Sequence, residues 1–193
     1  MRPLLLPFVP LYGAGVAIRN WFFDFGLLRS KKVSVPVISV GNLSAGGSGK
    51  TPLVELLAKR LMLSGRKVAI VSRGYKRESS GTVVVSNGTV QCAEALAAGD
   101  EPAQMAAKLT GVVVIVDERR ARGAMYAIEK FGANVIILDD GFQHRYLKRD
   151  LDILVLPVEE VEKPGWMFPA GNRREPITSI KRASLIAITR CES

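Results

Sequence analysis

Lys50 and Thr51 close a glycine-rich run that could hold phosphate groups. Residues 44–51 read Ser-Ala-Gly-Gly-Ser-Gly-Lys-Thr, close to the pattern G-x-x-x-x-G-K-[ST]. In this pattern backbone N–H groups surround a phosphate, the lysine reaches the β- and γ-phosphates, and the last hydroxyl binds Mg²⁺. Ser44 departs from the strict pattern, and the alternative is a glycine-rich turn that binds nothing. The order strand, loop, helix favours a nucleotide-binding loop made of Ser44, Ala45, Gly46, Gly47, Ser48, Gly49, Lys50 and Thr51.

A pair of aspartates supplies the second half of such a site. Asp139 and Asp140 directly follow the apolar run Val135–Leu138, which is typical of a buried strand. A carboxylate at the end of such a strand commonly holds Mg²⁺ directly or through water. Aspartate after a strand is also a common turn former. Together with the glycine-rich loop, however, the pair indicates a nucleotide-phosphate and metal site.

Other polar side chains follow strands or open helices at the same edge. Arg73 follows the strand 68–71 and could grip a phosphate, although a solvated loop arginine is nearly as good an interpretation. Asp100 stands where a helix begins; the spacing favours a helix cap over a general base. His144, the only histidine, is equally compatible with a ligand contact and a structural turn. Arg174 and Glu175 lie in the turn-rich stretch 166–176, which either closes over phosphates or simply connects two strands.

The elements that position these residues indicate an α/β fold. Apolar β-branched runs predict parallel strands, and leucine or alanine periodicity predicts helices between them. Asn87-Gly88 between two short runs predicts a β-hairpin that leaves the sheet. The strands are expected at 35–40, 68–71, 112–116, 135–138, 153–156 and 185–189, the hairpin arms at 82–86 and 89–92, and the helices at 53–63, 103–109 and 121–131.

The amino-acid composition limits the kinds of molecule that the protein is expected to bind. The net charge is +9, which suits nucleic acid, an anionic membrane or a phosphorylated substrate. Aromatic residues make up 7% and form no stacking pattern, so nucleic acid is not expected. Two cysteines are too few for a disulfide framework and lack metal-ligand spacing, which makes a reducing cytosol the default.

The first 32 residues form a distinct segment. Residues 3–18 carry no charge, aromatic residues follow, and the basic cluster Arg29, Lys31 and Lys32 closes the segment. Prolines and glycines interrupt the run, which argues against a membrane-spanning helix and against a signal peptide. We therefore expect residues 1–32 to be an amphipathic helix at an anionic membrane surface, followed by a core domain at 33–193. The alternative is a helix packed on its own domain.

In family order, the motifs SVGNLSAGGSGKTP, SRGY, GDEP, DDGFQHR and PAGNRREP resemble those of the tetraacyldisaccharide 4'-kinases. DDGFQHR is the most specific of them, and the family commonly has Thr or Ser where the strict loop has its first glycine. The resemblance implies a P-loop kinase fold that uses ATP and Mg²⁺ to phosphorylate an acylated glucosamine disaccharide, a lipid A precursor, at the cytoplasmic face of the bacterial inner membrane.

The resemblance also implies roles for single residues. Asp100 becomes the catalytic base, which reverses the preference for a cap that spacing gives. Lys50 and Thr51 would hold the triphosphate and Mg²⁺, with Asp139 and Asp140 at the metal. The expected substrate-binding residues are Arg73, Arg119, Gln143, His144, Arg174 and Glu175.

Two questions stay open at this level. Family members are considerably longer and carry a histidine partner for the base in a carboxyl-terminal domain, so we expect a fragment, a domain supplied otherwise, or a chain that is inactive alone. The alternative function is a P-loop GTPase or ATPase switch acting through a protein partner. Its support is residues 189–192, Thr-Arg-Cys-Glu, a poor likeness of the guanine-reading Asn/Thr-Lys-x-Asp loop.

Overall fold

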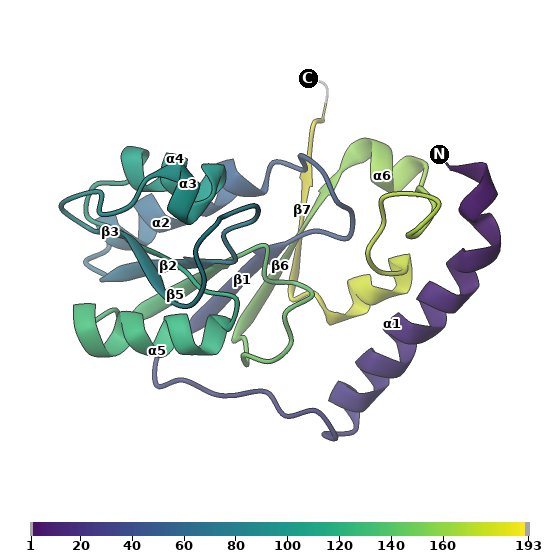
Figure 1. Cartoon of the computed structure of the whole chain (residues 1–193), viewed down its shortest axis with the longest axis horizontal. Helices are drawn as coiled ribbons and strands as arrows, with labels where there is room; N and C mark the ends of the chain where they lie inside the picture. Colours follow the sequence, from purple (N-terminus) through teal and green to yellow (C-terminus); the bar gives the residue numbers. More distant parts are fainter. Residues whose placement is uncertain (1, 192–193) are drawn as a thin grey trace.

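Apolar β-branched runs become the strands of one sheet in the computed structural model, which describes residues 2–191. The strand order is β3-β4-β2-β5-β1-β6-β7, and neighbours pair in parallel except β3, which is antiparallel to β4 (Figure 1). The predicted α/β class with a mostly parallel sheet is confirmed. The strands are β1 (Val37–Gly41), β2 (Val68–Ser72), β3 (Val83–Asn87), β4 (Val113–Val116), β5 (Val135–Asp139), β6 (Leu151–Pro157) and β7 (Leu185–Thr189).

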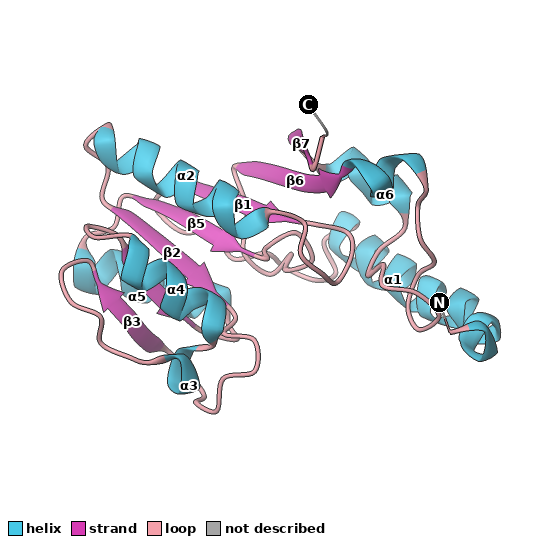
Figure 2. Cartoon of the chain, turned by 90° about the horizontal axis from the view of Figure 1, so that it is seen from above, coloured by secondary structure: helices cyan, strands magenta, loops and turns pink. Residues whose placement is uncertain are grey.

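Helices cover both faces of the sheet. Leucines on α2 and alanines on α5 pack against opposite faces, because successive strand residues point to opposite sides (Figure 2). The α-helices are α1 (Val9–Asp24), α2 (Lys50–Leu63), α3 (Ala95–Ala98), α4 (Asp100–Lys108), α5 (Arg120–Phe131) and α6 (Val158–Glu162), with 3-10 helices η1 (Pro3–Phe8) and η2 (Ile177–Arg182).

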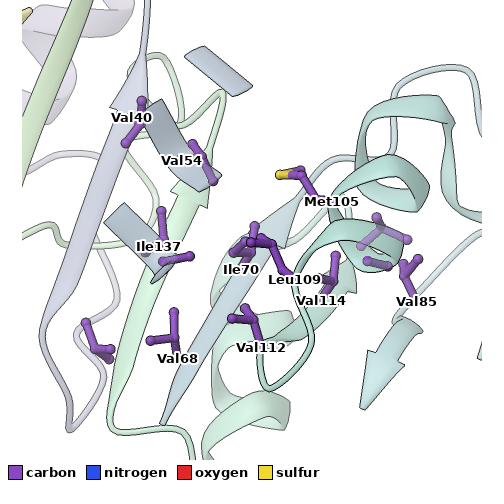
Figure 3. Packing of buried hydrophobic residues seen from close by; sticks show 14 of the residues in the cluster. Val40, Val54, Val68, Ile70, Val85, Met105, Leu109, Val112, Val114 and Ile137 are labelled. Atoms are coloured by element: carbon purple, nitrogen blue, oxygen red, sulfur yellow. The ribbon is translucent and has the colours of Figure 1, made fainter. Parts of the chain in front are cut away.

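The core beneath α2 and α4 fixes the end of the sheet that carries the polar residues. Val54 of α2 and Met105 of α4 are fully buried against Ile70 and Ile137 of the central strands (Figure 3). Strand register pairs Val40 with Asp139. The carboxyl ends of β1, β2 and β5 therefore meet at one edge, where α/β proteins bind ligands.

Two sequence expectations differ from the structure. Thr82–Ser86 corresponds to the edge strand β3 of the sheet itself, whereas 89–92 forms only an isolated bridge between Ser86 and Gln91. The side chain of Asn87 accepts hydrogen bonds from the N–H groups of Thr89 and Val90, so these two donors are used within the turn and not in a strand ladder. Helix α2 also begins earlier than the leucine pattern indicated, at Lys50 directly after the loop.

Helix α1 lies along one side of the molecule, apart from the main helix layers (Figure 1). Among its residues only Phe23 is buried. Within residues 2–191, no helix combines the length and the apolar character needed to cross a membrane.

Asp117 anchors the start of α5 and the edge strand. Its buried carboxylate accepts hydrogen bonds from the Arg119 N–H at 2.7 Å, from Thr82 Oγ1 at 2.5 Å and from Arg122 Nε at 2.8 Å. Burial alone would raise the pKa of Asp117, but these donors outweigh burial and hold the pKa below its ordinary value of 3.8. The carboxylate therefore stabilises the fold only in its charged form.

Asp117→Asn is expected to lower the free energy of unfolding by about 2 kcal/mol at pH 7, since hydrogen bonds to a charged group are lost. Because the folded-state pKa is depressed, the stabilisation is complete above pH ~4 and disappears as the pH falls through the folded-state value. Urea unfolding at pH 7 and near pH 3 measures this difference. The control Asp24→Asn removes an exposed carboxylate paired with Arg145 and should cost less than about 0.5 kcal/mol. An Asp117→Asn loss independent of pH would contradict the assignment.

Candidate phosphate and substrate site

The loop between β1 and α2 has the geometry that phosphate binding requires. Gly46 and Gly49 have φ angles of 144° and 80°, a backbone region that side chains rarely adopt. Gly49 directly precedes α2, whose first N–H groups have no partner within the helix and point back toward the loop. The positive end of the helix dipole therefore faces any anion held there.

Lys50 and Arg174 converge on Asp140. Lys50 Nζ lies 3.7 Å from Asp140 Oδ1, and Arg174 Nη1 lies 2.7 Å from Asp140 Oδ2. Burial alone would raise the pKa of Asp140, but the two cations hold it below its ordinary value of 3.8. Asp140 is therefore ionised at neutral pH, and the two cations balance its charge.

Asp139 is almost fully buried at the end of β5. Ser72 Oγ donates to Asp139 Oδ2 at 2.9 Å, while Asp139 Oδ1 has no hydrogen-bond partner among the described residues. Burial raises the pKa of Asp139 to about 6, with a further contribution from Asp140. A nearby divalent cation would reverse this shift, because it stabilises the carboxylate.

The donor set fits Mg²⁺ more closely than a metal held entirely by protein. Mg²⁺ prefers oxygen ligands and usually takes one or two carboxylates together with phosphate oxygens and water. The free oxygen of Asp139 and those of the neighbouring Asp140 are such oxygens at the cleft, and Thr51 carries a hydroxyl in the first turn of α2. Across residues 2–191, no cluster of three His, Cys, Asp or Glu side chains could hold a metal alone.

A cleft of about 1650 Å³ opens above these residues. Most of the predicted site lines it, although those residues come from all parts of the chain: Ala45, Gly46, Gly47, Lys50, Arg73, Asp100, Arg119, Asp139, Asp140, Gln143, His144, Arg174 and Glu175.

Four residues of the predicted loop do not line this cleft. Ser48 is buried and its hydroxyl accepts a hydrogen bond from Asn42 Nδ2, while Gly49 and Thr51 belong to the start of α2. Ser44 lines a neighbouring cavity of about 580 Å³ and donates its hydroxyl to Glu160.

Asp100 is the first residue of α4 and not its cap, so the cap interpretation is wrong. Gly99 occupies the cap position with φ 90°. Because glycine has no side chain, no side-chain cap bond forms. A Cβ at Gly99 would lie 2.8 Å from the carbonyl oxygen of Tyr75, so only glycine fits this sharp entry. The Asp100 carboxylate is exposed and borders the cleft. The side chains of Arg73 and Arg119 are also exposed and also border it.

Gln143 and His144 are built into the cleft wall. Gln143 Nε2 donates to the carbonyl of Asn42 at 2.7 Å and thereby connects the turn after β5 to the strand end that precedes the loop. Burial, together with the nearby Arg120, lowers the pKa of His144 to about 4. His144 is therefore neutral at pH 7, and its buried Nε2 has no partner among the described residues.

Glu175 is paired within the protein. Its buried carboxylate accepts a hydrogen bond from Arg182 Nη2, and Asn20 Nδ2 of α1 lies 3.5 Å away. One carboxylate oxygen, Oε1, lacks a partner among residues 2–191. Glu175, a predicted substrate-binding residue, thus borders the cleft, but its carboxylate is already bound by Arg182.

Sequence reasoning missed Arg120, Ser72 and Arg19. Arg120 is 5% exposed, lines the cleft and has a pKa lowered to about 10 by burial, despite the opposing influence of Asp140. Arg120 is the first residue of α5, whereas the exposed Arg119 precedes the helix. A run of two arginines does not reveal where the helix begins. Arg19 belongs to helix α1, which is distant in sequence, and its Nη2 donates a hydrogen bond of 2.6 Å to the Gln143 carbonyl.

A glycine loop between a buried strand and a helix, facing aspartates at the end of the adjacent strand, defines a P-loop nucleotide-binding protein. The family model for tetraacyldisaccharide-1-P 4'-kinase, LpxK, matches residues 1–193. The chain belongs to this family.

Relatives agree with this assignment. The chain is 49% identical over 192 residues to the tetraacyldisaccharide 4'-kinase of Aquifex aeolicus and 44% identical over 190 residues to that of Anaeromyxobacter dehalogenans, covering 98% of this chain in both cases. A crystal structure of Aquifex aeolicus LpxK in complex with ATP superimposes with a TM-score of 0.92 at 48% identity. The chain spans 59% and 50% of the two relatives' lengths, and 59% of the crystallised chain.

Proposed function

We propose that this chain provides the ATP-dependent kinase site of a tetraacyldisaccharide 4'-kinase. The reaction would transfer the γ-phosphate of ATP to the 4'-hydroxyl of a tetraacyl glucosamine disaccharide 1-phosphate in lipid A biosynthesis. The observation that carries the proposal is the convergence of Lys50, Asp139, Asp140 and Arg174 beside the phosphate loop, in one cleft with Asp100. The Aquifex relative crystallised with ATP supports the choice of nucleotide.

In this proposal the loop 44–51 surrounds the phosphates with its N–H groups, and Lys50 contacts the β- and γ-phosphates. Asp139, Asp140 and Thr51 would hold Mg²⁺, which when bound would neutralise the negative charge of the phosphates. Lys50 and Arg174 both pair with Asp140, so two cations already stand in the cleft where the phosphates would bind.

Asp100 is the proposed base. It accepts the proton of the sugar hydroxyl as that oxygen attacks the phosphorus, and its exposed carboxylate at the cleft makes this approach feasible. The remaining polar side chains surround the sugar and its 1-phosphate: Arg73, Arg119, Gln143, His144, Arg174 and Glu175. Neutral His144 would serve as a hydrogen-bond partner and not as a cation.

The proposal is tested with the chain, Mg²⁺, γ-labelled ATP and the lipid disaccharide in mixed micelles. We expect label to enter the lipid and calorimetry to show ATP binding in preference to GTP. A strong preference for GTP without labelled lipid would favour the switch-protein alternative. Against that alternative, the side chains of Thr189 and Arg190 donate hydrogen bonds to carbonyl groups of the phosphate loop. Glu192 lies outside the described residues.

We propose further that α1 docks on the anionic cytoplasmic face of the bacterial inner membrane. Its two faces differ. Tyr12, Arg19 and Phe23 contact the rest of the protein, with Tyr12 Oη donating to the Arg174 carbonyl at 3.0 Å. Its exposed side carries Leu11, Ile18 and Phe22, and the flanking residues Leu4, Phe8 and Phe25 extend this apolar surface beyond both ends of the helix.

Leu11→Ser with Phe25→Ser is expected to weaken binding to vesicles of anionic lipid by at least about tenfold, since each buried apolar side chain contributes about 1.5–3 kcal/mol. Leu11 and Phe25 are 70% and 68% exposed, so the change leaves the fold intact. Vesicle flotation measures the effect. Leu63→Ser, which alters a 78% exposed leucine on α2, is the matched control. Equal flotation of both variants would mean that α1 serves only as packing.

A further inference from the structure

Three side chains without a role in the proposed reaction contact the outer side of the phosphate-binding loop. They belong to Thr189, Arg190 and Glu160. Thr189 Oγ1 at the end of β7 donates to the Ser48 carbonyl at 2.8 Å, and the Arg190 guanidinium donates to the Gly47 carbonyl. These contacts join residues more than 140 positions apart in the sequence. The end of β7 therefore touches the loop at the two peptide groups that precede Gly49 and α2.

The first residue of the loop is tethered in the same manner. The Ser44 hydroxyl donates to the Glu160 carboxylate of α6, and the Ala45 N–H donates to the Asn172 carbonyl at 2.8 Å. Ser44 is the position at which the strict loop pattern has glycine. Its side chain is thus used on the outside of the loop, away from the phosphates.

The contacts on the outer side of the loop affect the N–H groups on its inner side, which would bind the phosphates. A peptide group that turns its N–H toward a phosphate turns its carbonyl the opposite way, and that carbonyl needs a donor. Arg190 and Thr189 supply donors to two such carbonyls. A glycine-rich loop without these contacts would populate many conformations, and binding would carry the entropic cost of ordering it.

The backbone of Arg190 supports a positioning role. Its φ is 57°, in the left-handed region, which is unfavourable for a residue other than glycine. Such a conformation persists only when its surroundings hold it. A Cβ at Gly49 would lie 3.4 Å from Thr189 Cγ2, so the end of β7 packs directly against the loop.

We propose that Glu160, Thr189 and Arg190 form an outer clamp that fixes the phosphate-binding loop in its nucleotide-accepting conformation before the nucleotide arrives. They are positioning residues, since they touch the loop and not the reacting atoms. The proposal rests on the proposed nucleotide-binding function of the loop. It also assigns a role to Ser44, whose hydroxyl binds the Glu160 carboxylate of the clamp.

The first test combines Arg190→Met with Thr189→Val and compares it with the conservative pair Arg190→Lys and Thr189→Ser. We expect the Met/Val variant to raise the Kd for MgATP about tenfold, since two hydrogen bonds are lost, and the conservative pair to stay within about threefold of the wild type. In nucleotide-free protein, hydrogen exchange of the 45–49 amides should accelerate only in the Met/Val variant. At saturating ATP, transfer should change much less than Kd, because the clamp acts on binding.

The second test restores the strict motif with Ser44→Gly. The clamp predicts weaker MgATP binding, because the Glu160 tether is lost, whereas Ser44→Thr keeps it. Tighter binding by Ser44→Gly, or unchanged Kd and loop exchange in the Met/Val variant, would overturn the clamp. If the wild-type chain itself failed to bind MgATP, the proposed function would fail, while loop exchange in nucleotide-free protein would still decide on the clamp.

Discussion

Asp100→Asn is expected to lower the rate of phosphate transfer by about 10²–10⁴-fold, the usual contribution of a general base. Asparagine keeps the shape of the side chain but cannot accept the proton of the attacking hydroxyl. Because Asp100 borders the cleft from the first turn of α4 while Lys50 lies in α2 at the phosphate loop, the Kd for MgATP should stay nearly unchanged. Single-turnover transfer and calorimetric titration measure the two quantities separately.

Thermal unfolding is the control for a structural effect of Asp100. A negative charge in the first turn of a helix stabilises it by only about 0.3–1 kcal/mol, and the structure gives Asp100 no side-chain cap bond. Glu129→Gln, which removes an exposed carboxylate at the far end of α5, is the matched variant and should keep full activity. Full turnover by Asp100→Asn would remove Asp100 from the mechanism.

Lys50→Met is expected to reduce transfer by about 10²–10³-fold, the typical cost of removing one preorganised charge from a transition state. Unlike Asp100→Asn, it should also weaken MgATP binding, because the Lys50 side chain is only 11% exposed and sits 3.7 Å from Asp140 at the phosphate loop. Methionine keeps the length of the chain and removes the charge. The ratio of the two losses separates binding of ATP from stabilisation of the transition state.

Lys59→Met is the matched control, since Lys59 is exposed on the same helix. It should bind MgATP and transfer phosphate like the wild type. If Lys50→Met bound MgATP as tightly as the wild type, the loop would hold phosphates through its backbone alone, and the role assigned to Lys50 would be wrong.

Local patterns predicted the parts of the site that are contiguous in sequence. The buried run before Asp139 and the glycines before Lys50 each define a strand end or a helix start, and parallel pairing then brings Val40 opposite Asp139. Helices α2, α4 and α5 and the order of strands along the chain also followed from periodicity. These features depend on backbone geometry that neighbouring residues impose.

Contacts between distant segments could not be predicted in this way. Nothing around Arg120 shows that it is buried while Arg119 is exposed, since this depends on how α5 packs against the sheet. The Asn87-Gly88 turn was visible, but the single bridge formed by its return arm depends on β4 as the partner of β3. The side-chain donors to the Gly47 and Ser48 carbonyls come from the end of β7, at a separation that no local pattern spans.

Helix α1 forms a wall of the cleft on one face and exposes an apolar stripe on the other. An α-helix with its side chains is only about 10–12 Å thick. A bilayer beneath this helix would therefore lie about one helix thickness from the near wall of the cleft, and a lipid could place its sugar in the cleft while its acyl chains stay in the hydrocarbon. The reaction rate would then depend on the mole fraction of the lipid in the surface and fall on dilution with inert lipid, even at constant bulk concentration.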